Sequence, residues 1–137
     1  MVANGVVIQT VDGELAVDLT GVRSVWKETE VSPSDLEVGD QLDLNGLGAP
    51  ASFAARYVWV NIGRFDGVVR AVVGTRLDLA RLPPSTLTFS VELSRYLVVV
   101  RAADIPATVA DLQPGLSVGG LVYRPKGGTP RATRIWF

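Results

Sequence analysis

The stretch SPSDLEVGD at residues 32–40 recurs in similar form as TVADLQPGL at residues 108–116, seventy-six positions later. In the first copy, Ser32 or Ser34 can cap the free amides of a short helical turn, and the fixed φ of Pro33 suits the start of such a turn. The next positions in both copies are Asp-Leu and, three residues further on, Gly. We interpret them as a cap, an apolar plug of the core and a turn glycine. The phrase therefore predicts the same tight connection in two places.

The alternative interpretation of this motif is a carboxylate pair, Asp35 with Asp40, that binds a metal ion or takes part in acid/base catalysis. Leu116 stands where Asp40 stands in the first copy. A short turn also cannot supply the six or more oxygen ligands that calcium normally takes. The structural interpretation is therefore favoured, and no metal site is predicted.

Further segments repeat in the same order on either side of this phrase. GVVIQTVDGELAVDL from Gly5 matches GVVRAVVGTRLDL from Gly67 at an offset of 62, and AARYVWV matches RATRIWF at an offset of 77, which sets Trp59 opposite Trp136. Similar features in the same order indicate an internal duplication. We expect a first repeat at residues 1–64 and a second at residues 65–137.

The change of offset from 62 to 76 predicts about fourteen extra residues in the second repeat, near residues 80–95. Pro83 and Pro84 cannot lie in a central strand, whereas TLTFSVEL alternates with the period of a strand. We expect a projecting loop that returns as a strand.

Each repeat reads as five short strands. An Asp-Gly turn at residues 12–13 joins two β-rich runs, the strongest hairpin signal in the chain. A tight connection between the third and fourth strands is typical of the OB-like small barrel, and closure removes the exposed edges of a short sheet. The predicted fold is all-β, with two tandem small OB-like five-stranded β-barrels and a projecting hairpin in the second.

These motifs also resemble a bacterial domain family of unknown function, in which a G-x-V hairpin, a D-L-x-x-G-D turn and a closing A-x-x-V/I strand recur. The matching segments are Gly5 to Leu19, Asp35 to Gly46 and Ala55 to Val60, with second copies beginning at Gly67, Asp111 and Ala132. The resemblance implies a part of an exported or cell-envelope protein and brings no catalytic residues. Leu116 in place of Asp40 departs from the pattern in the second repeat.

The composition excludes several classes of chemistry. The chain has no Cys and no His, which removes disulfides, thiolate nucleophiles, Cys- and His-based zinc sites and imidazole catalysis. No run approaches the roughly 20 apolar residues that span a bilayer, and the N-terminal stretch has no signal-peptide pattern. We expect no enzyme activity, no cofactor and no membrane span, and the sequence leaves the compartment open.

The charges are divided between the repeats. Residues 1–66 hold ten acidic and four basic residues, and residues 67–137 hold four acidic and nine basic residues, so −6 and +5 give the net charge of −1. We expect a protein partner, or self-association in which the acidic repeat of one molecule docks on the basic repeat of another. A polysaccharide is a further candidate partner, and nucleic acid a weaker one.

The C-terminal stretch YRPKGGTPRATRIWF carries the candidate binding residues. In an OB-like barrel its RPKGGTPR segment joins the fourth and fifth strands, a loop that often binds oligonucleotides or oligosaccharides. Positive charge and aromatic area are available there for an anionic or ring-shaped ligand. Trp26 has no counterpart in the second repeat and is either an interface residue or an exposed groove aromatic. The predicted site residues are Tyr123, Arg124, Lys126, Arg131, Arg134 and Trp26.

Two functions therefore remain open. The first is a non-catalytic binding or assembly module, as part of a bacterial cell-envelope or exported protein. The alternative is an OB-type protein that binds an oligosaccharide or single-stranded nucleic acid through the basic loop 124–131.

Overall fold

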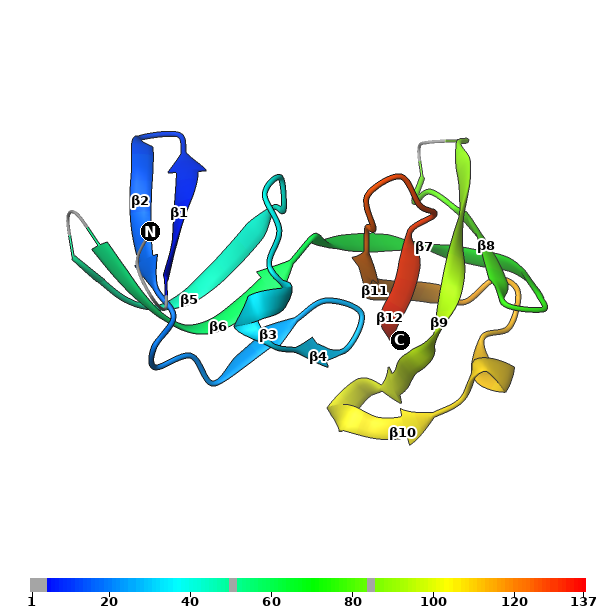
Figure 1. The fold of residues 1–137 in the computed structure, drawn as a ribbon. Coiled ribbons are helices and arrows are strands. Elements are labelled where there is room, and N and C mark those ends of the chain that lie inside the picture. Colours follow the sequence, from blue (N-terminus) through cyan, green and yellow to red (C-terminus); the bar gives the residue numbers. More distant parts are fainter. Residues whose placement is uncertain (1–4, 50–51, 84–85) are drawn as a thin grey trace. The chain divides into compact units, whose positions relative to one another are not determined.

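The computed structural model describes residues 5–49, 52–83 and 86–137 (Figure 1). The chain divides into two compact units, Met1–Asn61 and Ile62–Phe137. Strands form nearly all of the regular structure, and three short 3-10 turns complete it. The predicted all-β architecture of tandem small barrels is confirmed.

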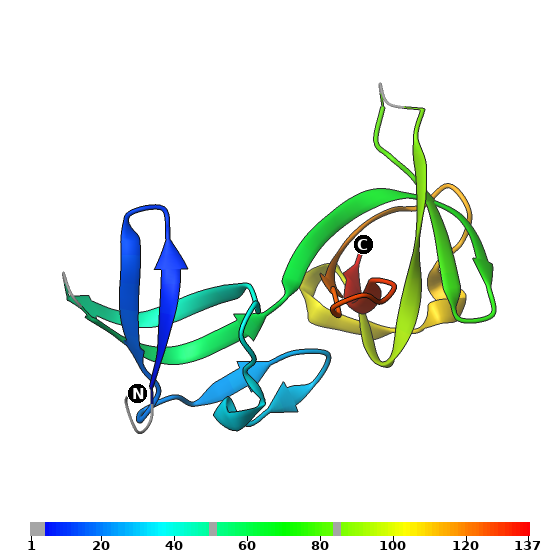
Figure 2. The ribbon, with the colours of Figure 1, turned by 45° about the horizontal axis from the view of Figure 1, so that its top comes forward.

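The second unit is a closed barrel. Its sheet runs β10-β9-β12-β11-β7-β8, and an additional pairing of β8 with β9 closes five of these strands into a ring (Figure 2). All neighbouring strands are antiparallel except the pair of β12 and β9, which run parallel to each other. The elements are β7 (Ile62–Val73), β8 (Arg76–Ala80), β9 (Thr88–Arg101), η2 (Ala102–Asp104), β10 (Ile105–Ala107), η3 (Val109–Asp111), β11 (Ser117–Tyr123) and β12 (Arg131–Trp136).

Alternation along the strands builds the core of this barrel. On β8 the residues at every second position face inward, so Leu77 and Leu79 are both 0% exposed. Val69 of β7, Val91 of β9 and Ile135 of β12 join them in one buried cluster.

The first unit is built from the same kinds of elements. These are β1 (Gly5–Thr10), β2 (Gly13–Asp18), β3 (Ser24–Trp26), β4 (Glu30–Val31), η1 (Pro33–Asp35), β5 (Leu42–Ala49) and β6 (Ser52–Val60). Its sheet has the order β1-β2-β6-β3-β4, and β5 pairs antiparallel with β6 along its whole length, on the edge opposite to β2 and β3. β2 and β3 both run parallel to β6, and they enclose a separate buried core that includes Val17, Val25, Val58 and Val60.

The two repeated turns have the predicted role. The backbone N–H of Ser32 donates to the Asp35 carboxylate at 2.9 Å, and that of Thr108 donates to the Asp111 carboxylate at 2.9 Å. Each pair forms a capping box at the start of η1 or η3. Asp40 is also structural, since its carboxylate accepts from the Glu37 N–H and the Asn61 side chain.

The strand register corrects one part of the sequence comparison. Val6 of β1 faces Val17 of β2, and β2 runs parallel to β6. In the second unit, Leu77 of β8 faces Val91 of β9, and β9 runs parallel to β12. β1 and β2 therefore take the places of β8 and of the first half of β9, so the sequence match of Gly5 with Gly67 does not reflect structural equivalence.

Most of the fourteen extra residues disappear when β1 is aligned with β8 and not with β7, because the offset between the two repeats is then larger from the start. The connection between β8 and β9 does form a projecting hairpin, as predicted for residues 80–95 (Figure 2). Pro84 and Ser85 of that segment lie outside the described residues.

The two tryptophans that match in sequence, Trp59 and Trp136, do not fill the cores of the two units. On β6 and β12 the buried positions are Val58, Val60 and Ile135. Trp59 and Trp136 are on the opposite face of their strands, and Trp136 is 36% exposed. Trp59 stacks on Tyr57 with ring centres 6.2 Å apart.

Candidate binding site at the mouth of the second barrel

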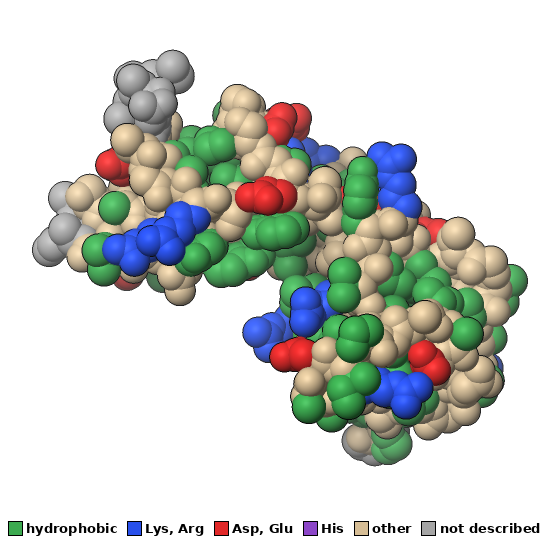
Figure 3. Space-filling model, turned by 90° about the horizontal axis from the view of Figure 1, so that it is seen from below, with side chains coloured by type: hydrophobic (Ala, Val, Ile, Leu, Met, Phe, Trp, Pro, Cys, Tyr) green, Lys and Arg blue, Asp and Glu red, His purple; other side chains and the backbone are tan. Residues whose placement is uncertain are grey.

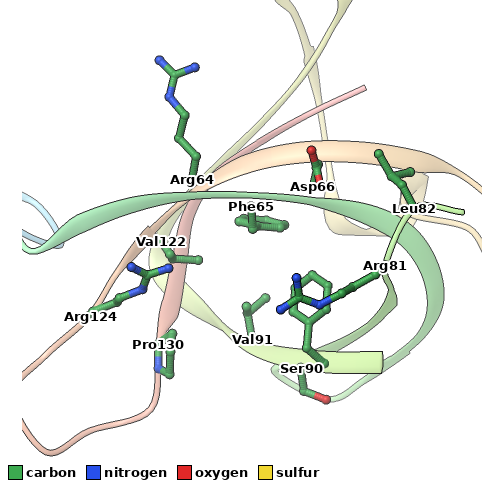
Figure 4. A pocket seen from close by; sticks show the side chains of 11 residues that line it. Arg64, Phe65, Asp66, Arg81, Leu82, Ser90, Val91, Val122, Arg124 and Pro130 are labelled. Atoms are coloured by element: carbon green, nitrogen blue, oxygen red, sulfur yellow. The ribbon is translucent and has the colours of Figure 1, made fainter. Parts of the chain in front are cut away.

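One end of the second barrel opens into a cavity of about 580 Å³, which we call the barrel mouth (Figure 4). Its walls come from β7, from β9, from the segment that follows β8 and from the loop between β11 and β12. The lining residues are Arg64, Phe65, Asp66, Arg81, Leu82, Phe89, Ser90, Val91, Val122, Arg124 and Pro130.

The floor of the barrel mouth is apolar. Val91 and Val122 are each 3% exposed, and the rings of Phe65 and Phe89 meet edge to face with centres 6.5 Å apart. Gly120 of β11 makes room for Phe65, because a Cβ on Gly120 would lie 2.4 Å from the Phe65 ring. A bulky residue at position 120 would therefore displace the ring that forms part of the floor.

Two arginines reach over this floor from opposite sides. Figure 4 shows the guanidinium groups of Arg81 and Arg124 turned toward each other, with Phe65, Val91 and Val122 between them, whereas Arg64 points away. The Arg81 guanidinium lies 5.7 Å from the centre of the Phe89 ring. Arg124 lies against Gly63, where an added Cβ would come 2.8 Å from its Cζ.

No acidic side chain of the described residues neutralises either guanidinium. Within residues 5–49, 52–83 and 86–137, neither Arg81 nor Arg124 forms an ion pair. In Figure 4 the Asp66 carboxylate, which also lines the cavity, points away from the space between the two arginines. Arginine presents several N–H donors in a planar fork that fits carboxylate and phosphate groups. The barrel mouth can therefore hold an anionic group over an apolar surface.

The predicted site residues only partly meet there. Arg124 lines the barrel mouth, and the loop that carries it does join the fourth and fifth strands of the barrel, as expected. Tyr123 and Arg131 instead pair with each other, with the Arg131 guanidinium 5.5 Å from the Tyr123 ring centre. Lys126 is exposed in the same loop but does not line the cavity.

Arg134 and Trp26 lie elsewhere. Arg134 pairs with Asp104 at 3.7 Å and lines a second, smaller hollow of about 390 Å³ together with Trp136. Trp26 belongs to the first unit, where it is 40% exposed and lies opposite Trp59 in the register of β3 with β6. Within the second unit, the predicted residues therefore do not gather around one cavity.

Sequence reasoning missed Arg81, Phe65 and Phe89. Arg81 lies in the segment that was predicted only to project, and nothing local marks it as a site residue. The alternation of Phe65, Gly67 and Val69 along β7 does indicate one face, but which face is inward depends on the strands that pair with it.

The acidic residues with lowered pKa values do not point to catalysis at the mouth. Hydrogen bonds from Thr20 lower the pKa of Asp18, and bonds from Ser90 and Arg76 lower that of Asp78. The backbone N–H of Thr108 likewise lowers the pKa of Asp111. None of the three lines the barrel mouth, and each serves a turn or a cross-strand bond.

The described residues contain no cluster of three or more His, Cys, Asp or Glu side chains that could hold a metal ion. The same residues include no helix with the length and apolarity needed to cross a membrane.

The face in Figure 3 shows basic and acidic side chains scattered among apolar ones, without one large patch of a single sign.

No protein-family model, curated protein or solved structure matches the chain.

Proposed function

We propose that the protein is a non-catalytic binding module and that its second barrel binds an acidic oligosaccharide at the barrel mouth. The observation that carries this proposal is the pair of ion-pair-free guanidinium groups, Arg81 and Arg124, on opposite sides of an apolar floor. A uronate residue has a carboxylate for an arginine fork and an apolar ring face for Phe65. Its size suits a cavity of about 580 Å³.

Single-stranded nucleic acid fits the site less well. Proteins that bind such strands present aromatic rings on which bases can stack. Here the Phe65 and Phe89 rings meet edge to face, so they do not form a row of parallel ring platforms on which successive bases could stack.

The resemblance to domains of exported and cell-envelope proteins supports the same ligand class, since acidic polysaccharides belong to that surrounding. We place the protein in a bacterial cell envelope as part of this proposal. Binding there would hold the chain on a polymer and would require no chemistry from it.

The test is a calorimetric titration of the full chain with oligogalacturonate, with a neutral oligosaccharide of equal length and with oligo-dT. We expect saturable binding of the oligogalacturonate alone, weakened roughly tenfold by Arg124→Glu and by Arg81→Glu, on the scale of a charge-assisted hydrogen bond. Arg70→Glu is the matched control, because Arg70 lies on β7 but does not line the cavity. Equal losses in all three variants would indicate general charge attraction and would overturn the proposal.

A further inference from the structure

The sheet of the first unit has two edges that the second unit does not have. In the second unit, β7 pairs with β11 through its first half and with β8 through its second half, so one strand closes the ring. By register, β1 takes the place of β8, and β5 takes the place of β11. Among the described residues, β1 pairs only with β2 and β5 pairs only with β6 (Figure 1).

The side chains beside this gap are less buried than their counterparts. Leu77 and Leu79, which β7 covers in the second unit, are each 0% exposed. Val6 and Ile8 stand at the equivalent positions of β1 and are only half-buried. Leu42 of β5 is likewise half-buried, whereas its counterpart Val118 is 5% exposed. Among the described residues, no strand covers the apolar interior of the first unit where β7 would lie.

A groove occupies this position. It holds about 820 Å³ and is lined by residues 6–11 of β1 and its turn and by residues 36–42 before and at the start of β5, which we call the β1–β5 groove. Two of its lining residues, Val11 and Val38, are apolar and fully exposed at 102% each. Apolar side chains in such positions mark an interaction surface when they gather along one groove.

The repeated turn shows how a strand would be held there. In the second unit, the N–H of Val69 on β7 donates to the Leu116 carbonyl, and the Val69 carbonyl accepts from the N–H of Gly115, both at 2.8 Å. Gly39 is the counterpart of Gly115 and has nearly the same backbone, with φ of 94° against 93°. In the described part of the chain, the Gly39 N–H has no backbone acceptor. This donor lies in the wall of the β1–β5 groove.

We propose that the β1–β5 groove accepts an extended segment of another protein, which adds a strand between β1 and β5 in the place that β7 takes in the second unit. Strand addition at an exposed sheet edge gains affinity from backbone hydrogen bonds and specificity from alternate side chains. The inward residues of the segment are apolar, because they meet Val6, Ile8 and Leu42. This surface is separate from the barrel mouth and does not depend on the function proposed for it.

Charge identifies the outward residues of that segment as basic. The unit that contains the groove, residues 1–61, holds nine acidic and three basic residues. Glu37 and Asp40 line the groove, and Asp12 directly follows Val11 at its rim. Complementary charge at a rim raises the association rate and makes binding sensitive to salt. The partner segment is therefore expected to alternate apolar with basic residues.

The chain itself provides the probe. A peptide of residues 62–74, IGRFDGVVRAVVG, contains the whole of β7, with Arg64, Asp66 and Arg70 at outward positions. Titration of isotope-labelled full chain with this peptide, followed by amide hydrogen exchange, reports where a strand is added. We expect slowed exchange for the amides of β1, β5 and Gly39, and no change in β8 and β11. A scrambled peptide of the same composition should have no effect.

Two rim variants sharpen the test. Glu37→Lys and Val38→Arg change exposed positions, and each should weaken the peptide roughly fivefold or more and reduce its salt dependence. Glu30→Lys is the matched control, since it reverses an exposed acid of the same unit outside the groove. Absence of binding, protection that appears in β8 and β11, or protection of β1 and β5 by self-association without peptide would each overturn the proposal.

Discussion

The difference in burial between the two units predicts that the same kind of substitution by alanine lowers the unfolding free energy by different amounts. Leu79 and Ile8 occupy equivalent positions in β8 and β1, but Leu79 is 0% exposed and Ile8 is half-buried. Full burial makes a leucine-to-alanine change cost about 3–5 kcal/mol, which includes the cavity left behind. We therefore expect Leu79→Ala to lower the unfolding free energy of the second unit by about 3 kcal/mol or more, and Ile8→Ala to lower that of the first by about half as much.

The expected loss is large compared with the stability of either unit. The second unit spans Ile62–Phe137. A stability of about 0.05–0.15 kcal/mol per residue gives a unit of this size roughly 4–11 kcal/mol. A loss of about 3 kcal/mol also lowers the melting temperature by roughly 12–24 °C, at about 4–8 °C for each kcal/mol.

Amide hydrogen exchange on the full chain measures the two units separately. The slowest amides of β6 report the first unit, and those of β12 report the second, because only global unfolding of the unit exposes them. An Ile8→Ala loss equal to that of Leu79→Ala would show that Ile8 is covered in solution. That result would refute the open edge between β1 and β5, and with it the reasoning about the groove.

The remaining predictions concern a close contact and a cap. Gly120→Ala should destabilise the second unit by roughly 1–3 kcal/mol, since the new Cβ would meet Phe65 and a backbone carbonyl, and thermal melting should show no such loss for Gly21→Ala, where nothing lies within 4 Å. Asp111→Asn should destabilise the chain at neutral pH, because the Thr108 N–H bond lowers the pKa of Asp111 below its ordinary 3.8 in the folded state. The stability from this carboxylate is present above that ordinary pKa and is lost as the pH falls through the folded value, so urea midpoints of the variant and the wild type should converge in acid.

Local signals in the sequence predict the local features of the structure well. The repeated motif predicts the capped turns, since hydroxyl and carboxylate caps and a turn glycine act within a few residues. The Asp12-Gly13 pair predicts the β1–β2 hairpin for the same reason. The basic loop of Arg124 could also be placed, because it follows from the order of the strands.

Long-range pairing could not be predicted in the same way. The β1–β2 and β7–β8 hairpins resemble each other in sequence because both are alternating runs around a tight turn. Whether the second strand of such a hairpin pairs in parallel with the closing strand depends on contacts far away in the chain. The sequence match therefore makes β1 the counterpart of β7, whereas the register makes β1 the counterpart of β8.

The same dependence on contacts between distant parts of the chain explains why the residues of the barrel mouth could not be predicted. Phe65 becomes part of the barrel mouth because Gly120, fifty-five residues later, leaves space for its ring. Arg81 becomes part of it because β9 returns beside β8 and brings the Phe89 ring under the Arg81 guanidinium. Side-chain type alone favoured Tyr123, Arg131 and Arg134, which the structure pairs with other groups of the same unit.

A strand bound in the β1–β5 groove would complete the first unit, so binding and stability are linked there. A ligand that binds only the folded state adds about 2.7 kcal/mol of stability when its free concentration is 100 times its Kd. The addition would fall on the first unit, which has the half-buried Val6, Ile8 and Leu42 to cover. The second unit already holds β7 in that place and has nothing comparable to gain. Under the two proposals, the closed barrel takes a small ligand at its mouth and the first unit takes a strand along β1 and β5, because the described residues of the first unit include no counterpart of β7.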